Sequence, residues 1–123
     1  MLYYNQEENN NTQEEKEINT MKHTKNMIYK PTVESHELFL YATNDGNLYR
    51  NMITPVIENM RRKAKKGLYD KEKAVDAYYH IATAASDKYN KDYGYSFSVT
   101  DRFTVAVDMV EYYEEEIYFE LNK

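Results

Sequence analysis

With 123 residues, 16 basic and 21 acidic side chains and a net charge of −5, the chain is long enough for one domain, or for two if one is very small. The absence of cysteine excludes a disulfide scaffold, a thiolate zinc site, an iron–sulfur cluster and a thiol nucleophile. No apolar run approaches the roughly 20 residues that span a membrane, and the amino terminus lacks a signal peptide's basic start and apolar stretch, so we expect a cytoplasmic protein without membrane contact.

Residues 1–35 have the composition of a disordered tail. From Asn5 to Thr20 the segment is almost entirely Asn, Gln, Glu and Thr, and Ile18 is its only aliphatic residue. Such a segment cannot bury enough apolar surface to offset the entropy that it would lose on ordering. Pro31 breaks any regular element near the end of this range. We therefore predict a disordered polar and acidic tail over 1–35 and a helical domain over 36–123.

A short apolar run from Glu37 to Thr43 opens the predicted domain. The residues after it, Asn44 to Asn47, have the chemistry of a turn. The run fits either a short strand or an extended arm that lies on helices. Because a lone strand has no sheet to join, we predict the arm.

The next stretch predicts the first of three helices. Its apolar residues fall on one face at three- and four-residue steps: Leu48, Met52, Ile53, Val56, Ile57, Met60 and Ala64. Asn44 or Asp45 can cap its start, and Gly67 fits the position just past its end. Pro55 either kinks a single helix or occupies the first turn of a second helix capped by Thr54. Since the apolar face continues through Pro55, we predict one helix that is kinked there.

Two further helices follow, separated by short connections that make neighbouring helices antiparallel. Asp70 is a favourable N-cap for the second helix, and Gly94 ends it. Residues 98–101 approximate a capping box at the start of the third. The apolar faces comprise Ala74, Ala77, Tyr78, Ile81, Ala82, Ala85 and Tyr89 in the second helix, and Phe103, Ala106, Val110, Tyr113 and Ile117 in the third. The sequence therefore predicts an all-α, three-helix domain.

Residues 45–117 contain a pattern that is specific in its order and spacing: Leu48-Tyr49, Pro55-Val56-Ile57, Asn59, Gly67-Leu68-Tyr69-Asp70, Lys73-Ala74, Lys88-Tyr89 and Gly94. In this pattern the chain resembles a family of small proteins encoded by tailed bacteriophages and prophages. Members of this family continue with a longer insert before the last helix, where this chain has only Tyr95-Ser96-Phe97. The family has no established activity, so the resemblance implies a context, a phage-derived accessory gene acting in the bacterial cytoplasm, and assigns no catalytic residue.

A basic stretch is the sharpest chemical feature of the sequence. Between Arg50 and Lys73 there are eight basic and three acidic residues, a net charge of +5. Cations grouped at a helix end can contact phosphates, and a neighbouring tyrosine can stack on a base. Cations at a helix C-terminus also satisfy its last carbonyls and its dipole, which is the alternative interpretation. The candidate nucleic-acid-binding residues are Arg50, Arg61, Arg62, Lys65, Lys66 and Tyr69.

The last predicted helix has the opposite charge. It carries seven acidic residues against one arginine between Asp101 and Glu120. Its carboxylates one turn apart can hold a hard cation weakly or form a solvated helix face. The chain also has 14 tyrosines, a residue enriched at protein interfaces, and some have no clear internal place: Tyr79, Tyr93, Tyr95, Tyr112 and Tyr118. The candidate partner-binding residues are Glu111, Tyr112, Glu115 and Tyr118.

The sequence contains few features that would support catalysis. The three histidines are scattered, and no Gly-rich phosphate loop or serine elbow is present. We therefore expect no catalytic residues, no metal and no cofactor. The predicted function is that of a small non-enzymatic phage accessory protein that binds a host protein or itself. The alternative is a nucleic-acid-associated protein that uses the basic end of the first helix.

Overall fold

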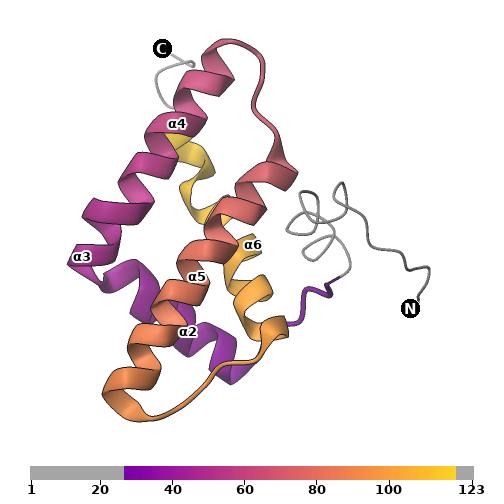
Figure 1. Cartoon of the computed structure of the whole chain (residues 1–123). Helices are drawn as coiled ribbons and strands as arrows, with labels where there is room; N and C mark the ends of the chain where they lie inside the picture. The colour runs from indigo at the N-terminus through magenta and orange to yellow at the C-terminus, as the bar shows by residue number, and fades with distance from the viewer. Residues whose placement is uncertain (1–26, 119–123) are drawn as a thin grey trace, which may run out of the picture.

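The computed structural model describes residues 27–118, and every regular element in this range is helical. The elements are α2 (Val33–Asn44), α3 (Gly46–Leu48), the π-helical turn η1 (Tyr49–Ile53), α4 (Thr54–Lys65), α5 (Lys71–Tyr93) and α6 (Val99–Tyr118) (Figure 1). The all-α prediction is thus confirmed. The tail predicted over 1–35 lies outside the described residues up to residue 26, and its predicted end at residue 35 falls inside α2.

The predicted extended arm is wrong, because residues 33–44 form the helix α2. A reciprocal cap begins the helix: the hydroxyl of Thr32 accepts a hydrogen bond from the Ser35 amide at 2.9 Å, and the Ser35 hydroxyl accepts one from the Thr32 amide at 2.8 Å. Ser35, Leu38 and Ala42 form the buried face. Residues 27–118 therefore contain one more helix than the three that we predicted.

The predicted kink at Pro55 takes a different form in the structure. The elements α3, η1 and α4 follow one another without a break, and the amide of Thr54 donates to the carbonyl of Tyr49, five residues earlier. Proline lacks an amide hydrogen, and its ring clashes with the carbonyl four residues before it, here that of Asn51. The wider π-helical turn next to Pro55 accommodates this defect, so the helix continues to Lys65.

The predicted ends of the later helices are confirmed. The Asp70 carboxylate caps α5 by accepting from the amides of Glu72 and Lys73, and Gly94 ends the helix with a positive φ of 73°. The Ser98 hydroxyl accepts from the Asp101 amide at the start of α6. Local sequence signals therefore define α5 and α6 well.

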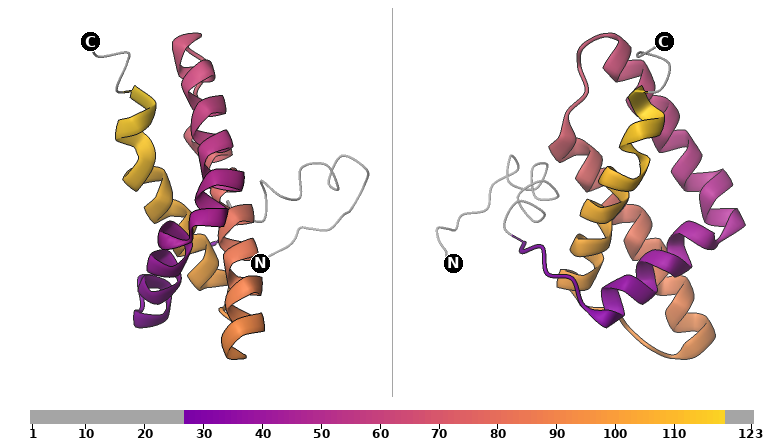
Figure 2. Two further views of the ribbon diagram at one scale, coloured as in Figure 1. Left: turned by 90° about the vertical axis from the view of Figure 1, so that its left-hand side faces the viewer. Right: turned by 180° about the vertical axis from the view of Figure 1, so that it is seen from behind.

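Helix α6 is central to the packing, because it contacts α5, α2 and α4. Seen from behind, α6 lies across α5, with α4 and α2 at its side (Figure 2). The largest fully buried side chains come from several elements: Leu38, Ile53, Tyr78, Ile81, Val105, Met109, Val110 and Ile117. Tyr79 is buried too, although it was among the tyrosines for which the sequence pattern indicates no clear internal place. Among the described residues, no helix is both long and apolar enough to cross a membrane.

Candidate protein-binding face of α6

Four residues form an outward stripe on α6, which we name the α6 outer face: Asp108, Glu111, Tyr112 and Glu115. Their spacing of three and four residues places them on one side of the helix. Glu111 and Glu115 are exposed, and Tyr112 is 59% exposed, whereas Met109, Val110 and Tyr113 between them are buried. Three of the four predicted partner-binding residues therefore share one surface.

The ring of Tyr112 is supported by α2. It meets the ring of Phe39 edge to face, with the centroids 5.4 Å apart and the planes at 87°. Such a contact restricts the orientation of an exposed aromatic side chain and lowers the entropy that it loses on binding. The sequence carries no signal for Phe39, because the contact depends on α2 being a helix packed beside α6.

An extended segment, residues 27–32, runs along α6; we name it the N-terminal strap. The Thr32 hydroxyl donates to Asp101 at 2.8 Å, and the Lys30 amide donates to the Thr104 hydroxyl at 2.8 Å. The Tyr29 hydroxyl donates to Asp108 at 2.7 Å. The strap thus follows the same side of α6 as the outer face and reaches its first residue, Asp108. The sequence offered no signal for these contacts, which join residues about 70 to 80 positions apart.

The electrostatics at the end of the strap favour a neutral tyrosine. The hydrogen bond to Asp108 raises the pKa of Tyr29 to about 12, with further contributions from partial burial and from the negative charges of Asp108 and Glu111. Tyr29 therefore keeps its hydroxyl proton and donates a hydrogen bond at neutral pH. The negative charge of Glu111 also helps to raise the pKa of this hydroxyl group.

We expect Asp108→Ala to return the pKa of Tyr29 toward the ordinary value of 10. Because the folded pKa is raised, this contact stabilises the fold fully below pH 10, and the stabilisation is lost as the pH rises through about 12. Carbon-13 NMR of labelled tyrosine checks the shift, with Tyr29→Phe identifying the resonance. An unchanged titration in Asp108→Ala would show that the strap does not hold Tyr29 against α6.

Tyr118, the fourth predicted partner-binding residue, follows Glu115 by three residues but does not share the exposure of the outer face. It is partly buried, and its ring meets that of Tyr69 edge to face at 5.7 Å. Burial, ahead of the charge of Glu114, raises the pKa of Tyr69 to about 12. The two rings pack against each other between α6 and the loop after α4. Tyr118 therefore contributes to internal packing.

The basic end of α4 lies against the acidic end of α6. The Arg61 side chain donates to the carbonyl of Glu116 at 2.8 Å, and the Lys71 ammonium lies 3.7 Å from Glu114. These contacts join the basic stretch and the start of α5 to α6. The alternative given for the basic stretch, cations that satisfy the last carbonyls and the dipole of their own helix, stays a prediction. Arg62, Lys65 and Lys66 remain exposed there.

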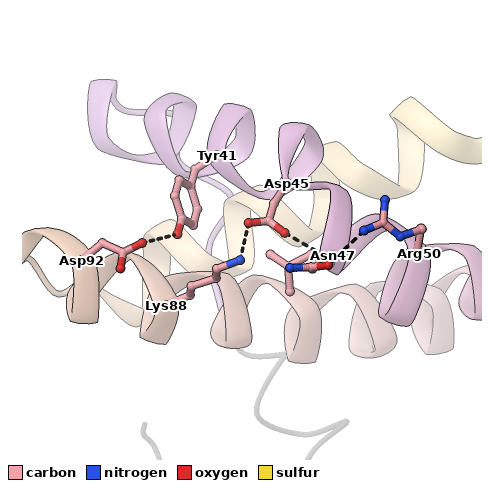
Figure 3. A network of polar contacts seen from close by, with 7 residues as sticks. Tyr41, Asp45, Asn47, Arg50, Lys88 and Asp92 are labelled. Carbon is pink, nitrogen blue, oxygen red and sulfur yellow. Dashed lines mark hydrogen bonds and ion pairs between the residues drawn. The ribbon is translucent and has the colours of Figure 1, made fainter.

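Arg50 does not join the other nucleic-acid-binding candidates. It lies eleven residues before Arg61, about 16 Å along the helix, and donates to Asn47 at 3.0 Å. It belongs to a polar network at the corner between α2 and α3, where Lys88 of α5 donates to Asp45 (Figure 3). The structure therefore separates the six candidates into a group at the end of α4 and one residue at the corner.

A second aromatic surface, which was not among the candidate sites predicted from the sequence, surrounds the end of α5. The ring of Tyr89 contacts those of Tyr41, Tyr93 and Phe97 at centroid distances of 5.1, 4.7 and 4.9 Å. Tyr93 is 67% exposed, so this cluster also reaches solvent. The spacing of Tyr89 and Tyr93 by one helical turn was the available signal.

Comparisons give no functional assignment for this chain. No family model matches it, and neither a curated protein nor a solved structure does. Within residues 27–118, no group of three or more His, Cys, Asp or Glu side chains is placed to hold a metal ion. The candidate site is therefore argued from its own geometry.

Proposed function

We propose that the chain is a small, non-enzymatic phage accessory protein that binds another protein, either a host protein or a second copy, through the α6 outer face. The observation that carries the proposal is the Tyr112 ring, which is 59% exposed yet fixed against Phe39. An oriented and exposed tyrosine is a typical anchor of protein interfaces. The family resemblance supports the phage context.

The charge around Tyr112 supports a partner with a basic surface. The ion pairs within the described range join Lys71 to Glu114 and Lys88 to Asp45, so Glu111 and Glu115 have no cationic partner among residues 27–118. Complementary charge accelerates association and selects among partners, while the aromatic anchor supplies most of the affinity. We therefore expect lysine or arginine side chains of the partner to face Glu111 and Glu115.

Capture of proteins from a bacterial lysate tests the proposal. The variant Glu111→Gln/Tyr112→Ala/Glu115→Gln should lower the yield of a captured protein about tenfold, since it removes the anchor and both charges. A matched control changes three exposed residues elsewhere, Glu58→Gln/Asp87→Asn/Tyr93→Ala, and should bind as the parent does. Sedimentation of the purified variants measures self-association in the same way.

Equal capture and equal self-association by both variants would contradict the proposal. Loss of the captured material on nuclease treatment would instead favour the alternative, nucleic-acid association. The exposed Arg62, Lys65 and Lys66 at the end of α4 support that alternative, and replacing them with alanine would then abolish a salt-sensitive interaction.

A further inference from the structure

The end of α4 carries a surface that complements the α6 outer face. Arg62 and Lys66, four positions apart, are both exposed, and neither takes part in the ion pairs within residues 27–118. Side chains at this spacing are neighbours on a helix, with their Cβ atoms about 6 Å apart. We name this surface, together with Leu68, the basic patch.

A fixed turn holds Leu68 in the basic patch. The Leu68 amide donates to the carbonyl of Lys63 at 2.7 Å, five residues earlier. The Gly67 amide donates to Ala64 at 3.0 Å, and Gly67 has a positive φ of 72°. This is a Schellman motif, in which the residue after the glycine commonly packs on an apolar side chain of the last helical turn. Here that turn offers Arg62 and Lys63, and Leu68 remains 64% exposed.

The α6 outer face has the same layout with the opposite charge. Glu111 and Glu115 are also four positions apart and exposed, and the exposed ring of Tyr112 lies on the same side of the helix. Because the two cations and the two carboxylates share one spacing, both ion pairs can form at once. Leu68 can then pack on the Tyr112 ring. The two surfaces therefore match in charge, in spacing and in apolar content.

The fold keeps these two surfaces of one molecule apart. The basic end of α4 is fixed to the last turns of α6, where Arg61 donates to the carbonyl of Glu116 at 2.8 Å. Tyr112 lies instead beside α2, through its contact with Phe39. Within residues 27–118, no ion pair joins α4 to the outer face. The complement of each surface therefore comes from another molecule, and a second copy of the chain carries both.

We propose that the partner of the α6 outer face is a second copy of the chain, which binds through its basic patch. The two cations of the patch pair with the two glutamates, and Leu68 packs on the ring of Tyr112. This inference rests on the proposed function of the outer face and names its partner. The contact is heterologous, because two different surfaces meet. With one aromatic anchor and two exposed ion pairs, the association belongs to the weak, transient class.

Charge reversal in the full chain, purified free of nucleic acid, tests the contact by sedimentation equilibrium. Arg62→Glu/Lys66→Glu and Glu111→Lys/Glu115→Lys should each weaken self-association at least about tenfold, because like charges then face each other. In an equimolar mixture, each surface again meets the opposite charge, so the two variants should associate within about threefold of the parent. Misfolded variants would not regain association in this way. A mixture that stays monomeric overturns the inference.

Two matched controls separate the contact from general effects of charge and apolar surface. Glu58→Lys/Asp87→Lys changes the net charge as the reversed outer face does, at exposed positions elsewhere, and should associate as the parent does. Leu68→Ala should weaken association about threefold, whereas Leu40→Ala, which also truncates an exposed leucine, should leave it unchanged. Equal effects within either pair of variants overturn the inference.

The outcomes distinguish this inference from the proposed function. A parent chain that stays monomeric up to about 500 μM overturns the inference, while loss of a captured host protein in the triple variant of the outer face would still support the proposed function. If the copies associate through another surface and capture does not depend on the outer face, both fail. Self-association of unpurified protein that disappears on nuclease treatment, with a monomeric purified chain, assigns the basic patch to nucleic acid and overturns the inference.

Discussion

Leu38→Ala should lower the free energy of unfolding by about 2 to 4 kcal/mol, whereas Leu40→Ala should change it by less than about 0.5 kcal/mol. Both residues lie in α2, two positions apart, but Leu38 is fully buried and Leu40 is 43% exposed. Truncating Leu38 leaves a cavity where α2 packs on α5 and α6. Truncating Leu40 removes surface that is already half in water and replaces it with a residue of slightly better helix propensity.

Chemical denaturation of the two variants measures this difference directly. Because a domain of this size is stable by only about 5 to 15 kcal/mol, the loss expected for Leu38→Ala is a large share of the total. Equal effects at the two positions would instead favour the extended arm that the sequence predicted for residues 37–43.

Helix α2 shows why the sequence predicted three of the helices and missed this one. The apolar positions of α4, α5 and α6 recur at helical spacing, and Asp70, Gly94 and Ser98 mark helix ends. In α2 the three consecutive apolar residues 38–40 obscure the helical period, and two of the three buried positions are the small residues Ser35 and Ala42. The helix is thus defined mainly by its packing against α5 and α6, which the local sequence does not reveal.

The candidate site, like the set of helices, was predictable from the sequence only in part. The sequence named Glu111, Tyr112, Glu115 and Tyr118 as candidates, from the one-turn spacing of the two glutamates and from tyrosines without a clear internal place. Tyr118 follows Glu115 by three residues, and only the contact with the ring of Tyr69 in the structure shows that it is packed. Phe39 and Tyr29, which complete the surface, come from distant segments of the chain. Contacts of this kind follow from tertiary packing alone.

Asp45→Ala should lower the free energy of unfolding by about 2 kcal/mol at pH 7. One carboxylate oxygen of Asp45 caps α3 by accepting from the Leu48 amide at 2.9 Å, and the other accepts from the Lys88 ammonium, which ties the corner between α2 and α3 to α5 (Figure 3). Alanine removes the cap, worth about 1 kcal/mol, and an ion pair that is worth about as much because it is only partly exposed.

Asp45→Asn separates the two contributions, since asparagine retains the capping oxygen but not the charge. We expect a loss of about 1 kcal/mol for this variant, with the difference from the parent reduced by salt. In Lys88→Gln/Asp45→Asn the second substitution should cost less than in the parent chain, because the pair is already broken. Additive effects would show that the two side chains do not interact in solution.

The contribution of Asp45 should also depend on pH, with a sign fixed by the direction of its pKa shift. The hydrogen bond from Lys88, followed by that from the Leu48 amide, holds the pKa of Asp45 below its ordinary value of 3.8. The folded state therefore binds the proton less tightly than the unfolded chain, and the stabilisation is complete above about pH 5. It is lost as the pH falls below 3.8 and through the lower folded pKa. Denaturation between pH 7 and pH 2 should show the parent losing its advantage over Asp45→Asn in this acid range. An advantage that persists unchanged to pH 2 would show that it does not come from the charge of Asp45.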